Sequence, residues 1–235
     1  MKNALQKISY ELKQNADEKT KKSGQRFFKE KIELYGVKSA VVRKIAKEYY
    51  KIISDKSKNE IFELCEELWK SGRLEETFIA CNWSDSLHKD YKPEDIKIFS
   101  NWIDNYVNNW ASCDTLCNHT VGAFIEKYPA HLSILKKWAK SDNRWMRRAA
   151  AVSLIIPAKR GLFLKDIFEI ADILLFDKDD MVQKGYGWLL KEASRNHLQE
   201  VFEYVVKNKQ NMPRTALRYA IEKMPKELKI KAMEK

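Results

Sequence analysis

The sequence predicts an all-α protein built from successive pairs of helices. Apolar residues recur every three to four positions along almost the whole chain, and no segment shows sustained alternation of apolar and polar residues. The 235 residues include only 7 Gly and 5 Pro, too few for the many tight turns of an all-β sandwich. Similar helical segments also return at a period of 34 to 36 residues, which is typical of an α-solenoid.

The predicted helices follow one another with short turns between them. They cover residues 4–15, 38–53, 57–72, 74–87, 92–107, 112–129, 131–142, 143–156, 163–177, 179–194, 198–210 and 213–225. Ser57 followed by Glu60 predicts a capping box, Gly72 predicts a helix end, and Pro93 fits the first turn of a helix. We expect the polar, lysine-rich stretch 15–26 to be a loop or a frayed helix end.

The repeat places one residue of each copy at an equivalent position. Aligning AAAVSL with GYGWLL sets Arg148 against Lys184, 36 positions later, and Arg218 follows after another 34. Asp114 lies 34 positions before Arg148, so three copies carry a cation and one carries a carboxylate. Helix pairs that bury their apolar faces on their neighbours form a solenoid of the HEAT or armadillo type, here expected as a single domain over residues 1–235.

The net charge limits the classes of partner. Lys and Arg number 44 against 33 Asp and Glu, a formal charge of +11 that favours polyanions, nucleic acid first. Two other readings stay open: a merely soluble basic protein, and basic repeat positions that only bond a carboxylate or helix end of the next repeat. The N-terminus lacks a long apolar stretch and the longest apolar runs are too short for a bilayer, so we expect a cytoplasmic protein without a membrane segment.

The four cysteines are expected to be reduced thiols in that compartment. Cys113 and Cys117, with His119 nearby, have a spacing that zinc sites allow. No fourth ligand of matching pattern follows, and Cys65 and Cys81 belong to other predicted helices. Small buried thiols on helices are far more common, so we expect no metal and no cysteine nucleophile.

Tryptophan is abundant, with 7 residues, and most tryptophans on helices are core residues. We interpret Trp69, Trp102 and Trp138 as packing residues, and Trp145 fits either the core or a binding surface. Asp114 stands one helical turn after a further tryptophan. From the residues alone it could equally bond a backbone amide at a helix start, since SCDTLC resembles an N-cap region.

Three motifs occur in order along the chain: Trp110-x-x-x-Asp114, the S-D-N-x-W-x-x-R run ending at Arg148, and the Q-K-x-x-G-W run ending at Trp188. With them, the chain from residue 26 to its last helices resembles the AlkD-type, HEAT-like-repeat DNA glycosylases, the DNA alkylation repair enzymes. The resemblance implies that Asp114 is the catalytic carboxylate, that Trp110 and Trp188 hold the backbone of the damaged nucleotide, and that Arg148 grips phosphate.

Further candidate contacts to DNA are Arg26, Phe27, Arg43, Lys44, Arg147, Lys184 and Arg218. For Lys184 and Arg218, phosphate binding and a bond within the repeat array are equally supported. The sequence departs from the family at Phe27, where the family has a tyrosine, and this leaves the role of the N-terminal segment open. The partner implied is duplex DNA with alkylated purines, bound by a monomer.

The chemistry follows from the substrate that the resemblance implies. A purine alkylated at N3 or N7 is cationic and leaves without a general acid, so the remaining problem is the positive charge that develops on the sugar. A nearby carboxylate stabilises that charge and orients water, and indole faces suit a cation. No cofactor is needed, and the family is known for not placing the base in a pocket. Two alternatives remain: a non-catalytic relative that binds damaged or branched DNA, and a protein-interaction scaffold.

Overall fold

Helices are the regular secondary structure of residues 2–234, the part of the chain that this computed structural model describes. Within that range no strand forms, and extended backbone meets only in an isolated β-bridge between Glu33 and Arg73. The predicted all-α class is confirmed. Contacts divide the chain into two compact units, Met1–Leu116 and Cys117–Lys235, each described by itself below. The expectation of a single domain stays a prediction.

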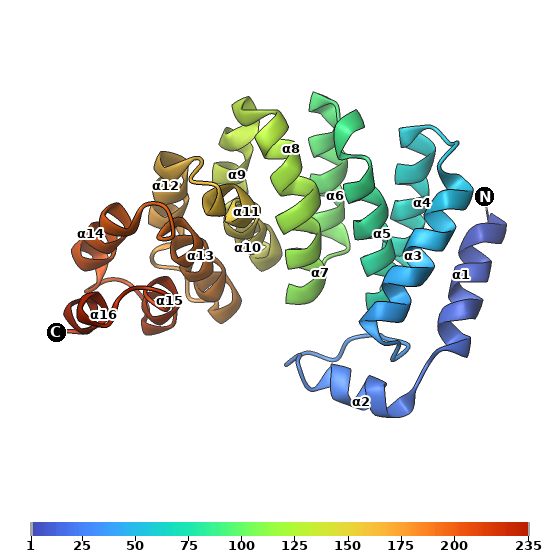
Figure 1. Ribbon diagram of the computed structural model, residues 1–235, viewed down its shortest axis with the longest axis horizontal. Coiled ribbons are helices and arrows are strands. Elements are labelled where there is room, and N and C mark those ends of the chain that lie inside the picture. Colours follow the sequence, from blue (N-terminus) through green and yellow to red (C-terminus); the bar gives the residue numbers. More distant parts are fainter. Residues whose placement is uncertain (1, 235) are drawn as a thin grey trace. The chain divides into compact units, whose positions relative to one another are not determined.

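The first unit contains seven α-helices and two short 3₁₀ turns in its described part (Figure 1). They are α1 (Lys2–Gln14), α2 (Glu18–Gln25), α3 (Ser39–Ile53), α4 (Lys58–Lys70), α5 (Leu74–Ser86), η1 (His88–Asp90), η2 (Pro93–Asp95), α6 (Ile96–Asn105) and α7 (Trp110–Thr115). Helix α5 is the centre of the packing, because it contacts α3, α4 and α7. The start of α7 is therefore supported by the best-packed helix of the unit.

The second unit continues with short helices. They are α8 (Gly122–Lys127), η4 (Pro129–His131), α9 (Leu132–Trp138), α10 (Arg144–Val152), α11 (Ile155–Lys159), α12 (Leu164–Leu174), α13 (Asp180–Ala193), α14 (Leu198–Asn208), α15 (Arg214–Ala220) and α16 (Lys226–Met233). Helix α13 packs against α10, α11, α12 and α15. Gly187 permits the approach of α15, because a Cβ at this position would lie 2.7 Å from the Ala216 carbonyl oxygen.

The predicted helix starts and ends are confirmed where local chemistry sets them. Ser57 accepts from the amide of Glu60 and the Glu60 carboxylate accepts from the Ser57 amide, which completes the capping box of α4. Gly72 follows α4 with a φ of +67°, a left-handed conformation that favours glycine. Pro93 occupies the first turn of η2, directly before α6.

The expectation of a loop or frayed end over residues 15–26 is wrong, because this stretch forms α2. The side chain of Asp17 accepts a 2.7 Å hydrogen bond from the backbone amide of Thr20 and another 2.7 Å bond from its hydroxyl. This N-cap satisfies the first turn of a helix that has no buried residue of its own. After α2, a connector of residues 26–38 leads to α3.

The predicted helix over residues 112–129 is interrupted. Helix α7 ends at Thr115, a π-helical turn occupies Leu116–Val121, and α8 follows. The helix predicted over 143–156 is likewise divided, into α10 and α11. A π turn inserts an extra residue into a helix and occurs frequently at functional sites.

The tryptophans expected in the core are there. Trp69, Trp102 and Trp138 are buried, and Trp145, which the sequence left open, is buried too. In the first unit Trp69 and Trp102 pack together with ring centroids 6.4 Å apart. Burial of these large rings is a major source of the stability of each unit.

Candidate functional site

Helix α7 positions Trp110 and Asp114 one turn apart on the same helix. Its N-cap is Asn109, whose side chain accepts a 2.9 Å hydrogen bond from the amide of Ser112. Asn109 therefore takes the capping role that the sequence left open for Asp114. The Asp114 side chain is buried, with 9% of its surface exposed. A carboxylate at this depth interacts more strongly with nearby charge than one in water.

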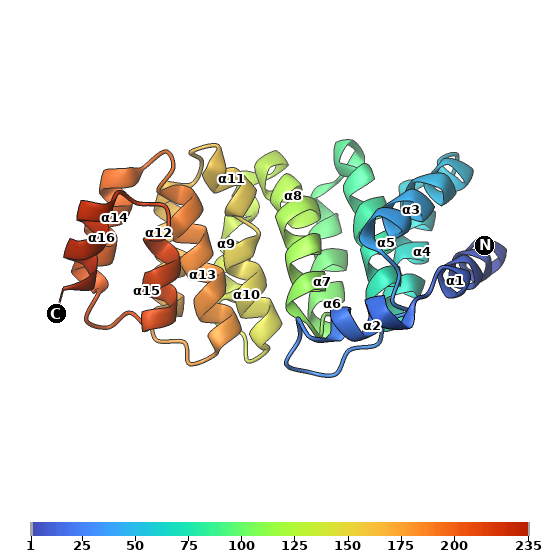
Figure 2. The ribbon, with the colours of Figure 1, turned by 60° about the horizontal axis from the view of Figure 1, so that its bottom comes forward.

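The indole of Trp110 is held in place by Phe27 and Phe28 of the connector after α2. Its ring stacks on Phe28, with centroids 5.4 Å apart and an interplanar angle of 22°. Its Nε1 donates a 3.3 Å hydrogen bond to the backbone carbonyl of Phe27. Figure 2 shows the chain after α2 passing beside α7, from which these contacts arise. Phe28 was not among the predicted site residues, although the RFFKEK run contains an aromatic pair that signals it.

The connector is fixed near its start by Gln25, the last residue of α2. The Gln25 amide donates a 2.8 Å bond to the carbonyl of Glu30 and accepts a 3.2 Å bond from the backbone N–H of Ile32. These bonds close a compact loop around Phe27 and Phe28. The two rings are therefore presented by a braced segment.

Glu75, at the start of α5, fixes the far end of the connector. Its carboxylate is almost fully buried and accepts backbone hydrogen bonds from Tyr35 at 3.0 Å, Gly36 at 2.8 Å and Val37 at 3.0 Å. Gly36 has a φ of +90°, and a Cβ there would lie 2.6 Å from the carbonyl oxygen of Asp17. The connector can therefore pass this close to the start of α2 only with glycine at this position.

The phenol of Tyr35 ties the same segment to α1 and α5. Its oxygen lies 2.8 Å from the Ser9 hydroxyl, donates a 2.6 Å bond to the Glu76 carboxylate and accepts a 2.7 Å bond from Arg73. Burial, and then the bond to Glu76, raises the pKa of Tyr35. The phenol therefore stays protonated and donates to the carboxylate.

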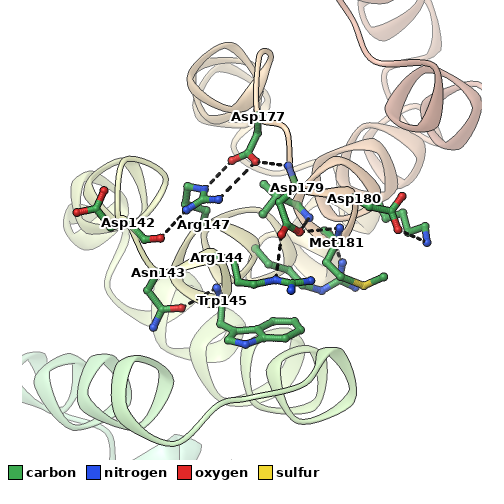
Figure 3. Close-up of polar contacts among 12 residues, drawn as sticks. Asp142, Asn143, Arg144, Trp145, Arg147, Asp177, Asp179, Asp180 and Met181 are labelled. Carbon is green, nitrogen blue, oxygen red and sulfur yellow. Dashed lines mark hydrogen bonds and ion pairs between the residues drawn. The ribbon is translucent and has the colours of Figure 1, made fainter. Parts of the chain in front are cut away.

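In the second unit, Arg147 is engaged in a network at the end of α12. It donates through Nε to Asp177 at 2.6 Å and through Nη1 to the carbonyl of Asp142 at 2.9 Å (Figure 3). Nη1 also donates a 2.9 Å bond to the carbonyl of Ser141. The Arg147 side chain is 20% exposed and that of Asp177 only 8%. The guanidinium thus joins α10 to the turn before α13.

Arg144 makes a second link to the same turn. Its Nε lies 3.0 Å from the carboxylate of Asp179, which also caps α13 by accepting from the amides of Met181 and Val182 (Figure 3). The guanidinium also lies over the ring of Trp145, 4.7 Å from its centroid. Cap, ion pair and ring contact therefore hold the two helices together.

Arg148 is buried, with 5% of its surface exposed, and its Nη1 donates to the carbonyl of Met181. Gly185 of α13 lies beside it: a Cβ at this position would be 3.4 Å from Cγ of Arg148, an ordinary van der Waals contact. The sequence predicts Arg147 and Arg148 as phosphate contacts, and the structure gives both an internal partner. Their role toward DNA stays a prediction.

The remaining candidates of the second unit lie on α13 and α15. Lys184 pairs at 2.7 Å with Asp180 of its own helix, and Arg218 is exposed. Trp188 is half-buried and donates a 3.1 Å bond from its indole to the buried carboxylate of Glu192. In the first unit, Arg26, Phe27, Arg43 and Lys44 are all exposed.

The cysteines pack inside the protein. Cys65, Cys81, Cys113 and Cys117 are all buried, and burial raises the pKa of the Cys65 and Cys81 thiols. Between residues 2 and 234, no three side chains of His, Cys, Asp or Glu gather as a metal site requires. Over the same range, no helix combines the length and apolar character needed to cross a membrane.

Comparison with known proteins adds the family. The sequence profile described as DNA alkylation repair enzyme matches residues 8–224. A solved structure described as a predicted DNA alkylation repair enzyme from Enterococcus faecalis has a similar fold, with a TM-score of 0.80 at 16% identity over 90% of this chain and 98% of that one. Comparison with curated proteins finds none that matches. The match over most of its length shows that this chain belongs to the DNA alkylation repair enzyme family, whose role lies in DNA repair.

Proposed function

We propose that the protein is a DNA glycosylase that hydrolyses the N-glycosidic bond of cationic N3- or N7-alkylated purines in duplex DNA. We further propose that its helix pairs form a HEAT-like α-solenoid whose basic surface binds the DNA backbone. Membership of the repair family supports the DNA substrate. The observation that carries the chemical part of the proposal is the arrangement of Trp110 and Asp114 on α7.

Asp114 suits the stabilisation of a sugar cation. It stands inside α7, one turn after Trp110, while Asn109 serves as the cap. As the cationic base departs, positive charge develops on the deoxyribose, and a carboxylate in a poorly hydrated position lowers the energy of that state. The same carboxylate can orient the attacking water or accept its proton.

The other roles concern binding. Trp110 offers a half-buried indole face braced by Phe28, which suits contact with a sugar or a cationic base. Trp188 is assigned to the DNA strand because the resemblance implies it, and its indole N–H is already oriented by Glu192. Among the cations of the repeat register, we assign Arg148 and the exposed Arg218 to phosphate.

The test is single-turnover release of 7-methylguanine from a methylated duplex, with binding of the same duplex measured separately. Asp114→Asn should reduce excision by on the order of a hundredfold or more and bind as tightly as wild type or more tightly, because it removes a negative charge that phosphates approach. Asp55→Asn is the control: it makes the same charge change at an exposed position between α3 and α4.

Two results would overturn parts of the proposal. Unchanged excision by Asp114→Asn would remove Asp114 from the chemistry. If the wild type binds the duplex tightly but releases no cationic purine, the protein is a DNA-binding member of the family without glycosylase activity.

A further inference from the structure

The first unit contains a cleft of about 1020 Å³ whose lining residues, apart from Trp110, have no part in the proposed glycosylase chemistry. Its walls come from α2, the connector, and the starts of α3, α5 and α7, and four aromatic rings line it: Phe27, Phe28, Phe78 and Trp110. A volume of this size is at the upper end of the range for small-molecule sites. Excision of a cationic purine needs no base pocket, so the cleft calls for another explanation.

Phe27 is the most unusual residue of this cleft. Phe27 is 71% exposed, although two hydrogen bonds fix its backbone. Its carbonyl accepts from the Trp110 indole, and its N–H donates a 3.2 Å hydrogen bond to the Gly24 carbonyl. Packing does not account for a large apolar ring that is presented outward by a braced backbone. The neighbouring Phe28 turns inward and stacks on Trp110. The geometry therefore provides one supported ring pair and one exposed ring beside it.

The chain around the cleft is strongly basic. Residues 17–31 contain six Lys and Arg against three Asp and Glu, and all six cations are exposed. Two exposed lysines, Lys19 and Lys38, line the cleft itself. Of its two acids, Glu75 is engaged by three backbone amides and Asp17 by the cap of α2. The cleft thus combines aromatic faces with positive charge at its rim.

We propose that this cleft holds an unpaired nucleobase of a DNA strand, stacked on Phe27, with the flanking phosphates on Lys19 and Lys38. Aromatic rings accept any base by stacking, and cations along the rim follow the strand, which is the combination that proteins use for unpaired nucleic acid. A protein partner would match the apolar rings but not the excess of positive charge. The inference rests on the DNA-binding part of the proposed function and not on excision.

The experiment compares three labelled probes by fluorescence anisotropy: a fully paired duplex, the same duplex with a one-nucleotide bulge, and the single strand. Wild type should prefer the bulged probe to the paired one. Phe27→Ala should lower affinity for the bulged and single-stranded probes by about tenfold and leave the paired probe within about twofold, because one stacking contact is lost. Phe27→Trp should restore binding.

Phe176→Ala is the matched control, because Phe176 lies in the second unit and is exposed to nearly the same degree, 69%. It should change none of the three affinities. A second signal comes from 2-aminopurine at the bulge, whose fluorescence should be quenched by wild type and by Phe27→Trp but not by Phe27→Ala. Thermal unfolding of each variant checks that the fold is intact.

Three outcomes would overturn the inference: no preference for the bulge, an equal loss on paired and bulged probes in Phe27→Ala, or unchanged affinities in that variant. Release of 7-methylguanine by the same proteins separates this inference from the proposed function. If wild type releases no base but binds the bulge through Phe27, the cleft stands and the glycosylase proposal fails. If excision occurs and the bulge is not preferred, the glycosylase proposal stands and the inference about the cleft fails.

Discussion

The connector of the first unit and the arginine cluster of the second use hydrogen bonds in opposite ways. Around Phe27, the connector is held through its backbone carbonyls, which accept from the side chains of Trp110 and Gln25, and the side chain of Phe27 is left exposed. In the cluster, the charged side chains carry them: Arg144 and Arg147 pair with Asp179 and Asp177. In the first region, bonds to the backbone hold the segment so that one side chain is exposed. In the second, bonds between side chains join two helices.

The comparison teaches that positive charge at a repeated position does not by itself identify a DNA contact. Arg148, Lys184 and Arg218 occupy equivalent positions in the sequence, yet Arg148 bonds a carbonyl, Lys184 pairs with Asp180, and Arg218 is exposed. Guanidinium groups serve both structure and phosphate recognition. Variants that separate stability from DNA affinity distinguish the two uses.

The largest effect on stability is expected at Glu75. Glu75→Ala leaves the buried amides of residues 35–37 without their acceptor, which should lower the free energy of unfolding by about 3 kcal/mol or more. Urea unfolding followed by circular dichroism measures it. The control, Glu63→Ala, removes an exposed carboxylate on α4 and should cost little. Equal stability of the two variants would mean that the connector does not depend on Glu75.

Arg147→Ala should have the next largest effect. It removes the partner of the mostly buried Asp177 and two carbonyl contacts, and should lower the stability of the second unit by about 2 kcal/mol. Lys178→Ala, one residue from Asp177, removes a charge in the same turn and is the control. A loss of DNA affinity in Arg147→Ala without loss of stability would contradict the structural role and return Arg147 to phosphate.

Arg218→Ala should show the opposite pattern. Thermal unfolding should be unchanged, while duplex affinity should fall a few-fold for damaged and undamaged DNA alike, and the salt slope of log affinity should drop by about one. Binding isotherms at several salt concentrations measure this. If wild-type affinity does not depend on salt at all, the protein is better explained as a scaffold for other proteins.

The smallest effect is expected at the cap of α2, which supports the connector. The hydroxyl of Thr20, followed by its amide, lowers the pKa of Asp17 below its ordinary value of 3.8. A carboxyl whose folded pKa is lowered stabilises the fold above the unfolded pKa, and this contribution disappears as pH falls through the folded value. In an NMR titration Thr20→Ala should move the Asp17 pKa upward. The Glu60 carboxyl, whose pKa is lowered by Ser57, should not move in that variant.

Much of the fold could be predicted because it depends on local chemistry. Apolar periodicity predicts the helices, and the Ser57 and Glu60 pair predicts the start of α4. Helix α2 was missed because it buries no residue, so periodicity carries no signal there; only its cap at Asp17 indicates it. The interruption after α7 was missed because a π turn keeps a helical pattern of residues.

The candidate site was predictable only in part. Trp110 and Asp114 stand in one motif on one helix, so the sequence places them together. Phe28 and Glu75 were missed because each acts on a residue far away in the chain: Phe28 on Trp110, and Glu75 on the backbone of residues 35–37. The partners of Arg147 were hidden for the same reason, since Asp177 follows 30 positions later.

The buried cysteines have a consequence for a protein that works where alkylating reagents are present. Such reagents attack thiolates, the strongest nucleophiles among protein side chains, and Cys113 is the immediate neighbour of Asp114. All four thiols are buried, and burial keeps those of Cys65 and Cys81 protonated. The fold therefore keeps its own thiols away from the class of reagent whose damage its family repairs.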